Sequence, residues 1–206
     1  MLKNLTNVTV AILGAVATSA ATLPTPAFAI NSVSEESKIQ ETATNEVAPE
    51  KPKIKRFICK GCNTNESLTL EFLQNNGITD KNALATIMGN IRQESTFVPN
   101  ICEGGIRTSY RGCTRGGYGL IQFTSQSRYN GLGNFAARYG GDPSSLDTQL
   151  RYIINESQWK NIEDGLKVPG KSIDHYMRLA YSWLGWGHHG ARTQFAYSYA
   201  NRLVLS

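Results

Sequence analysis

Residues 79–99 read TDKNALATIMGNIRQESTFVP and carry the clearest helical pattern in the 206-residue chain. Within this segment Leu84, Ile87, Met88 and Ile91 recur every three or four positions, as on the buried face of a helix. We expect Thr79 to cap the start of this helix, and the helix must end before Pro99, because the residue preceding a proline is pushed out of the helical region. A glycine inside it, Gly89, indicates that a neighbouring helix approaches closely.

The same spacing predicts further helices on both sides of this segment. They cover residues 66–75, 126–139, 145–158, 172–184 and 191–203. Residues 118–124 alternate in hydropathy as a strand does, and neither an internal repeat nor a βαβ alternation is visible. The chain is therefore predicted to be mainly α (α+β), a helical domain with a small β or loop excursion between Pro99 and Phe123.

The first 29 residues have the features of a secretory signal peptide. Lys3 is their only charge, residues 8–21 are mostly apolar, and a small-x-small pattern ends at Ala29, where we expect cleavage. An uncleaved membrane anchor is the alternative, which Pro24 and Pro26 disfavour because they interrupt a continuing helix. The protein is therefore expected to be secreted, periplasmic or cell-wall associated.

Residues 30–56 are rich in Ser, Glu, Thr, Asn, Lys and Pro and lack apolar periodicity, which is typical of a disordered linker. Residues 57–206 then form the folded domain. Its 15 basic side chains outnumber its 11 acidic ones, giving +4 of the whole chain's net charge of +5. A positive charge suits a polyanionic partner, but it does not by itself indicate nucleic acid, and we expect no nucleic-acid partner. No apolar run beyond the N-terminus is long enough to predict a membrane span.

Four cysteines lie in this domain, and an exported protein is expected to use them in disulfides. We favour Cys59 with Cys62 and Cys102 with Cys113, since the second pair would close a short glycine-rich loop. A four-cysteine zinc site is the alternative, although the second pair is spaced too widely for it. The pair His188-His189 is interpreted as a turn, and neither a metal nor a cofactor is predicted.

The residue that carries a candidate chemistry is Glu94, in the last turn of the predicted central helix. A carboxylate there meets the negative end of the helix dipole, and an apolar neighbour such as Phe97 acts in the same direction. Both effects favour the protonated carboxyl that a glycosidase uses to donate a proton to a leaving sugar oxygen. The alternative is that Glu94 is an ordinary solvated glutamate at a helix end, with no catalytic role. Most glycosidases use a second carboxylate, for which Glu103 and Asp142 are candidates.

Two segments of this sequence occur together in a known family. The pattern Gly-Asn-x-x-x-Glu-Ser-x-Phe-x-Pro at residues 89–99, then Tyr-Gly-Leu-x-Gln-Phe at residues 118–123 and a downstream Arg128, resembles the phage tail lysozyme family. This family belongs to the lysozyme-like superfamily, with lytic transglycosylases and goose-type lysozymes. The resemblance covers roughly residues 69–203 and implies a lysozyme-like helical catalytic domain.

Carried onto this chain, the resemblance makes Glu94 the catalytic acid and places a set of residues along a glycan cleft. This set is Tyr118, Gly119, Leu120 and Gln122. The ring of Tyr118 could stack on a sugar, Gln122 could bind an acetamido group, and glycines 116, 117 and 119 would let backbone approach the substrate. Ser95 and Glu103 are further candidates for contact with the substrate.

Two classes of function remain open at this point. One is a glycosidase, a muramidase or lytic transglycosylase that cleaves the β-1,4 bond between N-acetylmuramic acid and N-acetylglucosamine. The other is a non-catalytic peptidoglycan-binding or structural cell-wall module. The poised acid Glu94 favours the enzyme. The resemblance implies a single-glutamate mechanism if no second carboxylate serves, with a hydrolysed or a 1,6-anhydro product. The expected partner is the glycan strand of peptidoglycan, and the protein is expected to be a monomer.

Overall fold

A computed structural model describes residues 55–206 of the chain. The predicted signal peptide, residues 1–29, and the predicted linker, residues 30–56 except its last two, lie outside the described residues. Within the described part, no helix has the length and hydropathy needed to cross a membrane.

The described residues form a mainly α fold, which confirms the predicted fold class. In chain order its elements are β1 (Phe57–Cys59), α1 (Thr64–Asn75), α2 (Lys81–Ser95), β2 (Ile101–Cys102), β3 (Ile106–Arg107), the 3-10 turn η1 (Tyr110–Gly112), α3 (Gln126–Tyr139), α4 (Leu146–Ile153), α5 (Ser157–Lys160), α6 (Glu163–Lys167), α7 (Ile173–Leu184), α8 (Arg192–Arg202) and β4 (Leu203–Leu205).

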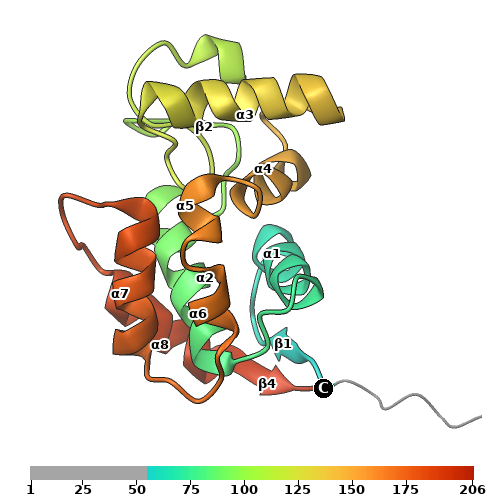
Figure 1. Cartoon of the computed structure of the whole chain (residues 1–206), viewed down its shortest axis with the longest axis vertical. Helices are drawn as coiled ribbons and strands as arrows, with labels where there is room; N and C mark the ends of the chain where they lie inside the picture. The colour runs from blue at the N-terminus through green and yellow to red at the C-terminus, as the bar shows by residue number, and fades with distance from the viewer. Residues whose placement is uncertain (1–54) are drawn as a thin grey trace, which may run out of the picture. The chain divides into compact units, whose positions relative to one another are not determined.

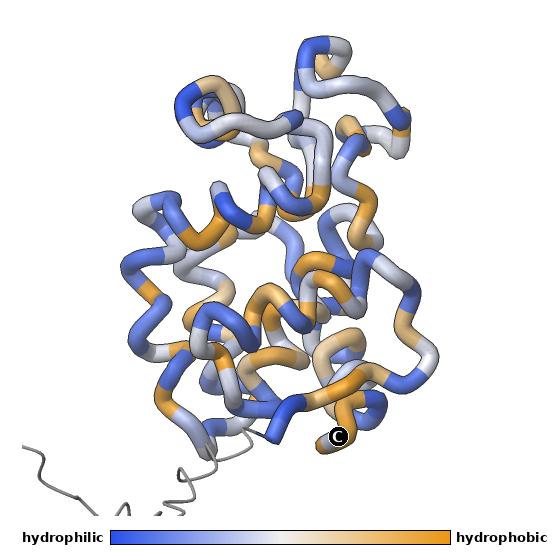
Figure 2. The backbone as a smooth tube through the Cα atoms, turned by 90° about the vertical axis from the view of Figure 1, so that its right-hand side faces the viewer, coloured by the Kyte–Doolittle hydropathy of each residue, from blue (hydrophilic) through white to orange (hydrophobic). Residues whose placement is uncertain are grey.

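Helix α2 runs through the middle of the helical part, with α7 and α8 on one side and α1 on the other (Figure 1). Its most extensive contacts are with α8. Residues 83–91 of α2 are buried, so the helix supplies much of the core. Figure 2 shows hydrophobic stretches alternating with hydrophilic ones along the helices, as expected for helices that turn one face inward. This central position fixes where the end of α2, and therefore Glu94, lies.

The predicted close approach at Gly89 is confirmed. A Cβ atom added there would lie 2.6 Å from the backbone nitrogen of Ala196 in α8 and 2.9 Å from its Cα. Backbone atoms cannot move aside as a flexible side chain can, so only glycine allows α2 and α8 to pack at this distance.

Gly89→Ala should therefore destabilise the protein by about 1–3 kcal/mol, because it overpacks the contact between α2 and α8. Gly187→Ala is the control, since a Cβ at Gly187 meets no atom within 4 Å. This control should change stability by less than about 0.5 kcal/mol. Urea unfolding of both variants checks the prediction, and equal stability of the two variants would contradict it.

Three local predictions are wrong. Asp80, not Thr79, caps α2, and its carboxylate accepts hydrogen bonds from the backbone nitrogens of Asn82 and Ala83 at 2.8 and 3.0 Å. The helix predicted over residues 145–158 is interrupted between α4 and α5, where the backbone of Glu156 is extended. Residues 118–124 form turns instead of a strand, because positive φ angles of 75° at Gly119 and 49° at Gln122 interrupt an extended path.

The ends of the described chain are tied together by a two-stranded sheet that the sequence did not predict. Strand β1 pairs antiparallel with β4. Next to it, the buried carboxylate of Glu66 accepts hydrogen bonds from the Tyr199 hydroxyl and, at 2.7 Å, from the backbone nitrogen of Asn63. Burial opposes the charge of Glu66, but these bonds and the nearby Arg202 outweigh it and hold its pKa below the usual value.

The four cysteines form the two favoured disulfides, Cys59–Cys62 and Cys102–Cys113. The sulfurs are thus not available as the thiolate ligands of the alternative zinc site. The second disulfide closes the excursion between α2 and α3, which contains the short hairpin of β2 and β3.

Two tyrosines fasten this excursion to α3. Tyr110 and Tyr129 stack with ring centroids 4.2 Å apart. The Tyr110 hydroxyl donates to the Tyr129 carbonyl at 2.7 Å, and the Tyr129 hydroxyl donates to the carbonyls of Tyr110 and, at 3.1 Å, Cys113. The Cys102–Cys113 disulfide and these two tyrosines together hold the excursion beside the end of α2.

Candidate active site

A cleft with a volume of about 590 Å³ opens beside the C-terminal end of α2. Three segments form its walls: the end of α2, residues 121–128, and the loop from α7 to α8 with the first residue of α8. The lining residues are Glu94, Ile121, Gln122, Thr124, Ser125, Arg128, Leu184, Gly185, Trp186, Gly187, His188 and Arg192. Of the sequence-predicted site residues, Glu94 and Gln122 are among them.

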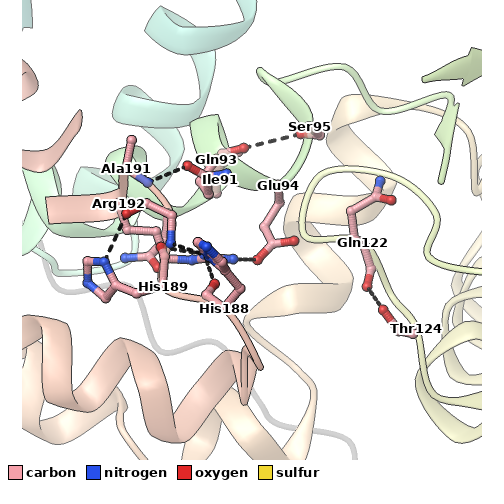
Figure 3. Close-up of polar contacts among 12 residues, drawn as sticks. Ile91, Gln93, Glu94, Ser95, Gln122, Thr124, His188, His189, Ala191 and Arg192 are labelled. Carbon is pink, nitrogen blue, oxygen red and sulfur yellow. Dashed lines mark hydrogen bonds and ion pairs between the residues drawn. The ribbon is translucent and has the colours of Figure 1, made fainter. Parts of the chain in front are cut away.

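Glu94 projects from the last turn of α2 into this cleft (Figure 3). The Glu94 side chain is 15% exposed. It forms an ion pair with the side chain of Arg192, which is 5% exposed. One carboxylate oxygen accepts the hydrogen bond from Nη2 of Arg192. The other oxygen is turned away from Arg192, toward the side of the cleft where Gln122 lies (Figure 3).

Phe97, the apolar neighbour expected for Glu94, does not line the cleft. Phe97 is buried away from the cleft, with its ring centroid 6.0 Å from that of Tyr199, and its backbone carbonyl accepts a hydrogen bond from Asn65 at 2.9 Å. The backbone bends sharply after Ser95, with φ of 51° at Thr96 and 62° at Phe97, which turns the phenyl ring inward. The neighbour of the Glu94 carboxylate is a guanidinium instead.

Arg192 was not predicted as a site residue. It lies 98 positions after Glu94 in the sequence, and it is the first residue of α8. A cation at a helix N-terminus faces the positive end of the helix dipole, which is unfavourable without a compensating partner. The position of Arg192 at the start of a helix was therefore the feature of the sequence that indicated an acidic partner such as Glu94.

Ser95 is buried and links two segments of the site, so its prediction as a substrate contact is wrong. Its hydroxyl donates to the backbone carbonyl of Leu120 at 2.8 Å and to that of Ile91 at 3.3 Å. The serine therefore joins the end of α2 to the turn at residues 118–122. This bond gives a physical reason for the Glu-Ser pair and the Gly-Leu-x-Gln segment to occur in one chain.

Tyr118 and Leu120 are completely buried, which corrects their assignment to the cleft surface. The Tyr118 ring packs edge-on against Tyr110 and Tyr129, and its hydroxyl donates to the Thr108 carbonyl at 3.1 Å. Burial raises the pKa of this hydroxyl. Tyr118 therefore packs in the core beneath the turn at residues 118–122, and its ring is not exposed for stacking on a sugar.

The glycines of this turn make room for side chains of the protein itself, and not for a sugar as expected. A Cβ at Gly116 would collide with Glu103, one at Gly117 with Gln122, and one at Gly119 with Gln149.

Gln149, which the sequence gave no reason to select, is fully buried and joins the turn to two other segments of the chain. Its Oε1 accepts from the backbone nitrogen of Leu120 at 2.8 Å, and its Nε2 donates to the carbonyls of Pro99 and Pro143 at 2.6 and 2.8 Å.

Gln122 does line the cleft, opposite Glu94 (Figure 3). Its Nε2 donates to the backbone carbonyl of Gly119 at 3.0 Å, which fixes the side chain. The amide oxygen accepts no hydrogen bond from the described residues and is a candidate acceptor for a donor on the substrate.

Neither candidate for a second carboxylate lies in the cleft. Glu103 is exposed, and its carboxylate accepts a hydrogen bond from the backbone nitrogen of Gly117 at 3.0 Å. Asp142 lies beside a different cavity and accepts from the backbone nitrogen of Ser144 at 2.8 Å. Among residues 55–206, Glu94 is therefore the one acidic side chain that lines the cleft.

Arg128, which lines the cleft, forms a buried ion pair with Glu156, which lies behind it. Arg128 donates from Nε to Glu156 at 2.8 Å and from Nη2 to the other oxygen of the same carboxylate. The indole nitrogen of Trp183 donates to Glu156 at 2.8 Å. This network accounts for the break between α4 and α5, because the extended backbone at Glu156 turns its carboxylate inward.

The two histidines lie in the loop before α8, as interpreted from the sequence. Nδ1 of His188 accepts from the backbone nitrogen of Gly190 at 3.1 Å, and His189 pairs with Thr193 at 3.1 Å. In the described part of the chain, no three His, Cys, Asp or Glu side chains gather as metal ligands do.

Comparison with known proteins agrees with this arrangement. A family model described as phage tail lysozyme matches residues 64–199. Morphogenesis protein 1 of Bacillus phage B103 is 33% identical over 109 residues, which cover 51% of this chain and 28% of that protein. The match thus spans less than a third of that relative. Because the family model covers more than half of the sequence, the chain belongs to the phage tail lysozyme family.

Proposed function

We propose that this protein is an exported glycosidase that cleaves the β-1,4 bond between N-acetylmuramic acid and N-acetylglucosamine in peptidoglycan, with Glu94 as general acid and base. The observation that carries the proposal is the position of Glu94, a partly exposed carboxylate in a cleft of about 590 Å³ with one oxygen turned toward the side where Gln122 lies. Membership of the phage tail lysozyme family supports the same substrate class.

The first step is proton donation by Glu94. Its carboxyl proton passes to the glycosidic oxygen, the bond from C1 to that oxygen breaks, and the bonding electrons stay on the leaving sugar. Positive charge develops at C1 of the muramic acid residue. Glu94 is left as a carboxylate, and the guanidinium of Arg192 beside it stabilises that negative charge.

The second step needs a nucleophile, and no other acidic residue of the described chain lines the cleft to supply one. We therefore propose that the substrate itself captures C1, through its N-acetyl carbonyl oxygen or its 6-hydroxyl group. The Glu94 carboxylate then accepts a proton, either from an attacking water, which gives a hydrolysed end, or from the 6-hydroxyl, which gives a 1,6-anhydro end.

Loss of turbidity of purified cell walls tests this proposal against the alternative of a non-catalytic wall-binding module. The enzyme should lower the turbidity and release soluble glycan fragments. Sedimentation of the protein with the walls, without release of fragments, would show the binding module and overturn the proposal.

Export is part of the proposal, and two features support it. The first 29 residues read as a signal peptide, and the domain has two disulfides, which persist in oxidising compartments. A monomer stays the expected state.

Binding to intact walls should weaken as salt rises, because the domain carries an excess of positive charge. Exposed arginines of the excursion, Arg107, Arg111 and Arg115, are the candidates for contact with anionic wall polymers. Attraction between exposed charges is screened over about 8 Å at physiological ionic strength. Activity on short neutral glycan fragments should change much less with salt. Sedimentation with walls and fragment cleavage, each measured from low to high salt, check this, and an equal salt dependence would contradict it.

A further inference from the structure

The buried guanidinium of Arg192 contacts both Glu94 and the loop that forms one side of the cleft. We propose that Arg192 is a positioning residue, which holds one oxygen of Glu94 so that the other faces the glycosidic bond, and which ties this carboxylate to the loop of residues 185–190. The inference rests on the proposed function and extends it, because it assigns the orientation of the acid to a residue outside the motifs in the sequence.

The contact with Glu94 involves one oxygen only. Nη2 of Arg192 donates to Oε1 of the carboxylate, and Oε2 accepts no hydrogen bond from the described residues. Figure 3 shows the second oxygen directed toward the side of Gln122, away from the arginine. With one oxygen held, the carboxylate cannot rotate freely, so the second oxygen is the one that presents the proton to a sugar in the cleft.

The other contacts of Arg192 are with the loop. Nη1 donates to the backbone carbonyls of His188 and His189 at 2.8 and 2.7 Å, and the guanidinium carbon lies 4.7 Å from the centroid of the Trp186 ring. Gly185 and Gly187 of this loop have open space around their Cβ positions, whereas Gly190 packs against Gln93, and Trp186 packs edge-on against Tyr181. The arginine is thus the contact that links the loop and its tryptophan to Glu94.

Two observations separate this arrangement from an ordinary structural ion pair. Nε of Arg192 is buried without a hydrogen-bond partner among the described residues, which is unfavourable for stability. The arginine also faces the positive end of the α8 dipole, which is unfavourable too. An arginine chosen for stability alone would avoid both costs, so its place is better explained by the carboxylate that it orients.

The chain offers a matched control on the same helix. Arg202, the last residue of α8, donates to two backbone carbonyls, those of Lys60 at 3.0 Å and Gly61 at 2.6 Å. It also lies 4.9 Å from the Tyr199 ring centroid and 3.5 Å from the Glu66 carboxylate. These are the same kinds of contact as those of Arg192, but Arg202 does not line the cleft.

The test compares Arg192→Met, Arg192→Lys and Arg202→Met on soluble, uncrosslinked peptidoglycan glycan strands, with folding monitored by circular dichroism. Arg192→Met should lower kcat by about 10²-fold with KM changed by less than about threefold, since misplacing a catalytic group by 1 Å can cost that much. Arg192→Lys should recover part of kcat, because an ammonium reaches Glu94 but cannot hold the loop carbonyls as well. Arg202→Met should lower the melting temperature and leave kcat within about twofold.

Two results would overturn the inference. One is a folded Arg192→Met protein with wild-type kcat, and the other is an equal loss of kcat in Arg202→Met. Failure of the proposed function is a separate outcome, recognised when the wild-type protein cleaves no glycan or when Glu94→Gln remains active. The inference alone fails if three results are found together: the wild-type protein cleaves glycan, Glu94→Gln is inactive, and Arg192→Met is fully active.

Discussion

Glu94→Gln should reduce the cleavage of purified cell walls by at least about 10²- to 10⁴-fold, the usual contribution of a general acid. The amide keeps the size of the side chain and one oxygen for the hydrogen bond from Arg192, so the end of α2 should stay folded. It has no proton to give to the leaving oxygen and cannot accept one in the second step. Turbidity loss measures the effect, circular dichroism confirms folding, and sedimentation should show nearly unchanged wall binding.

Glu103→Gln is the matched control for this prediction, because it makes the same chemical change at an acid outside the cleft. We expect a mild effect on activity, in line with a single-glutamate mechanism. A collapse comparable with that of Glu94→Gln would establish a mechanism with two carboxylates. Substantial lysis by folded Glu94→Gln protein would contradict the whole assignment of the active site.

Glu156→Gln should cost about 3–5 kcal/mol of unfolding free energy, the largest effect on stability that we predict. The Glu156 side chain is 2% exposed and is the partner of Arg128, which lines the cleft. An amide in its place leaves the positive charge of Arg128 buried without compensation, and only one oxygen remains for Arg128 and Trp183.

The control for this variant is Glu163→Gln, which removes a carboxylate that pairs with the more exposed Lys160 and Lys167. Hydrogen bonds from these two lysines hold the pKa of Glu163 below its usual value, but water screens such pairs. We expect a loss of no more than about 1 kcal/mol. Urea unfolding measures the loss of stability in both variants. Losses of equal size would contradict the prediction, because the buried ion pair would then stabilise the protein no more than the exposed one.

The parts of the fold that the sequence predicted correctly are those set by local chemistry. The apolar spacing around Leu84 marks α2, and the predicted starts of α3, α4 and α7 lie within one residue of the observed ones, which Ser125, Ser145 and Ser172 cap. The absence of a side chain at Gly89 indicated the contact with α8 before its partner was known. The disulfide pairs are likewise close in sequence.

The parts of the site that could not be predicted depend on contacts between distant segments. Nothing near Tyr118 indicates that its ring is buried, because that follows from the packing of Tyr129 and from Gln149 holding the turn. The pairing of Glu94 with Arg192 joins residues 98 positions apart. Local patterns thus located the acid, whereas its neighbours became visible only in the folded chain.

Mass spectrometry of the fragments released from purified peptidoglycan tests the central claim most directly. If Glu94 cleaves the β-1,4 bond as proposed, the new ends at C1 are N-acetylmuramic acid residues, either hydrolysed or in the 1,6-anhydro form, and the new non-reducing ends are N-acetylglucosamine. Fragments with new N-acetylglucosamine reducing ends, fragments cut only in the peptide, or no fragments at all would contradict the account.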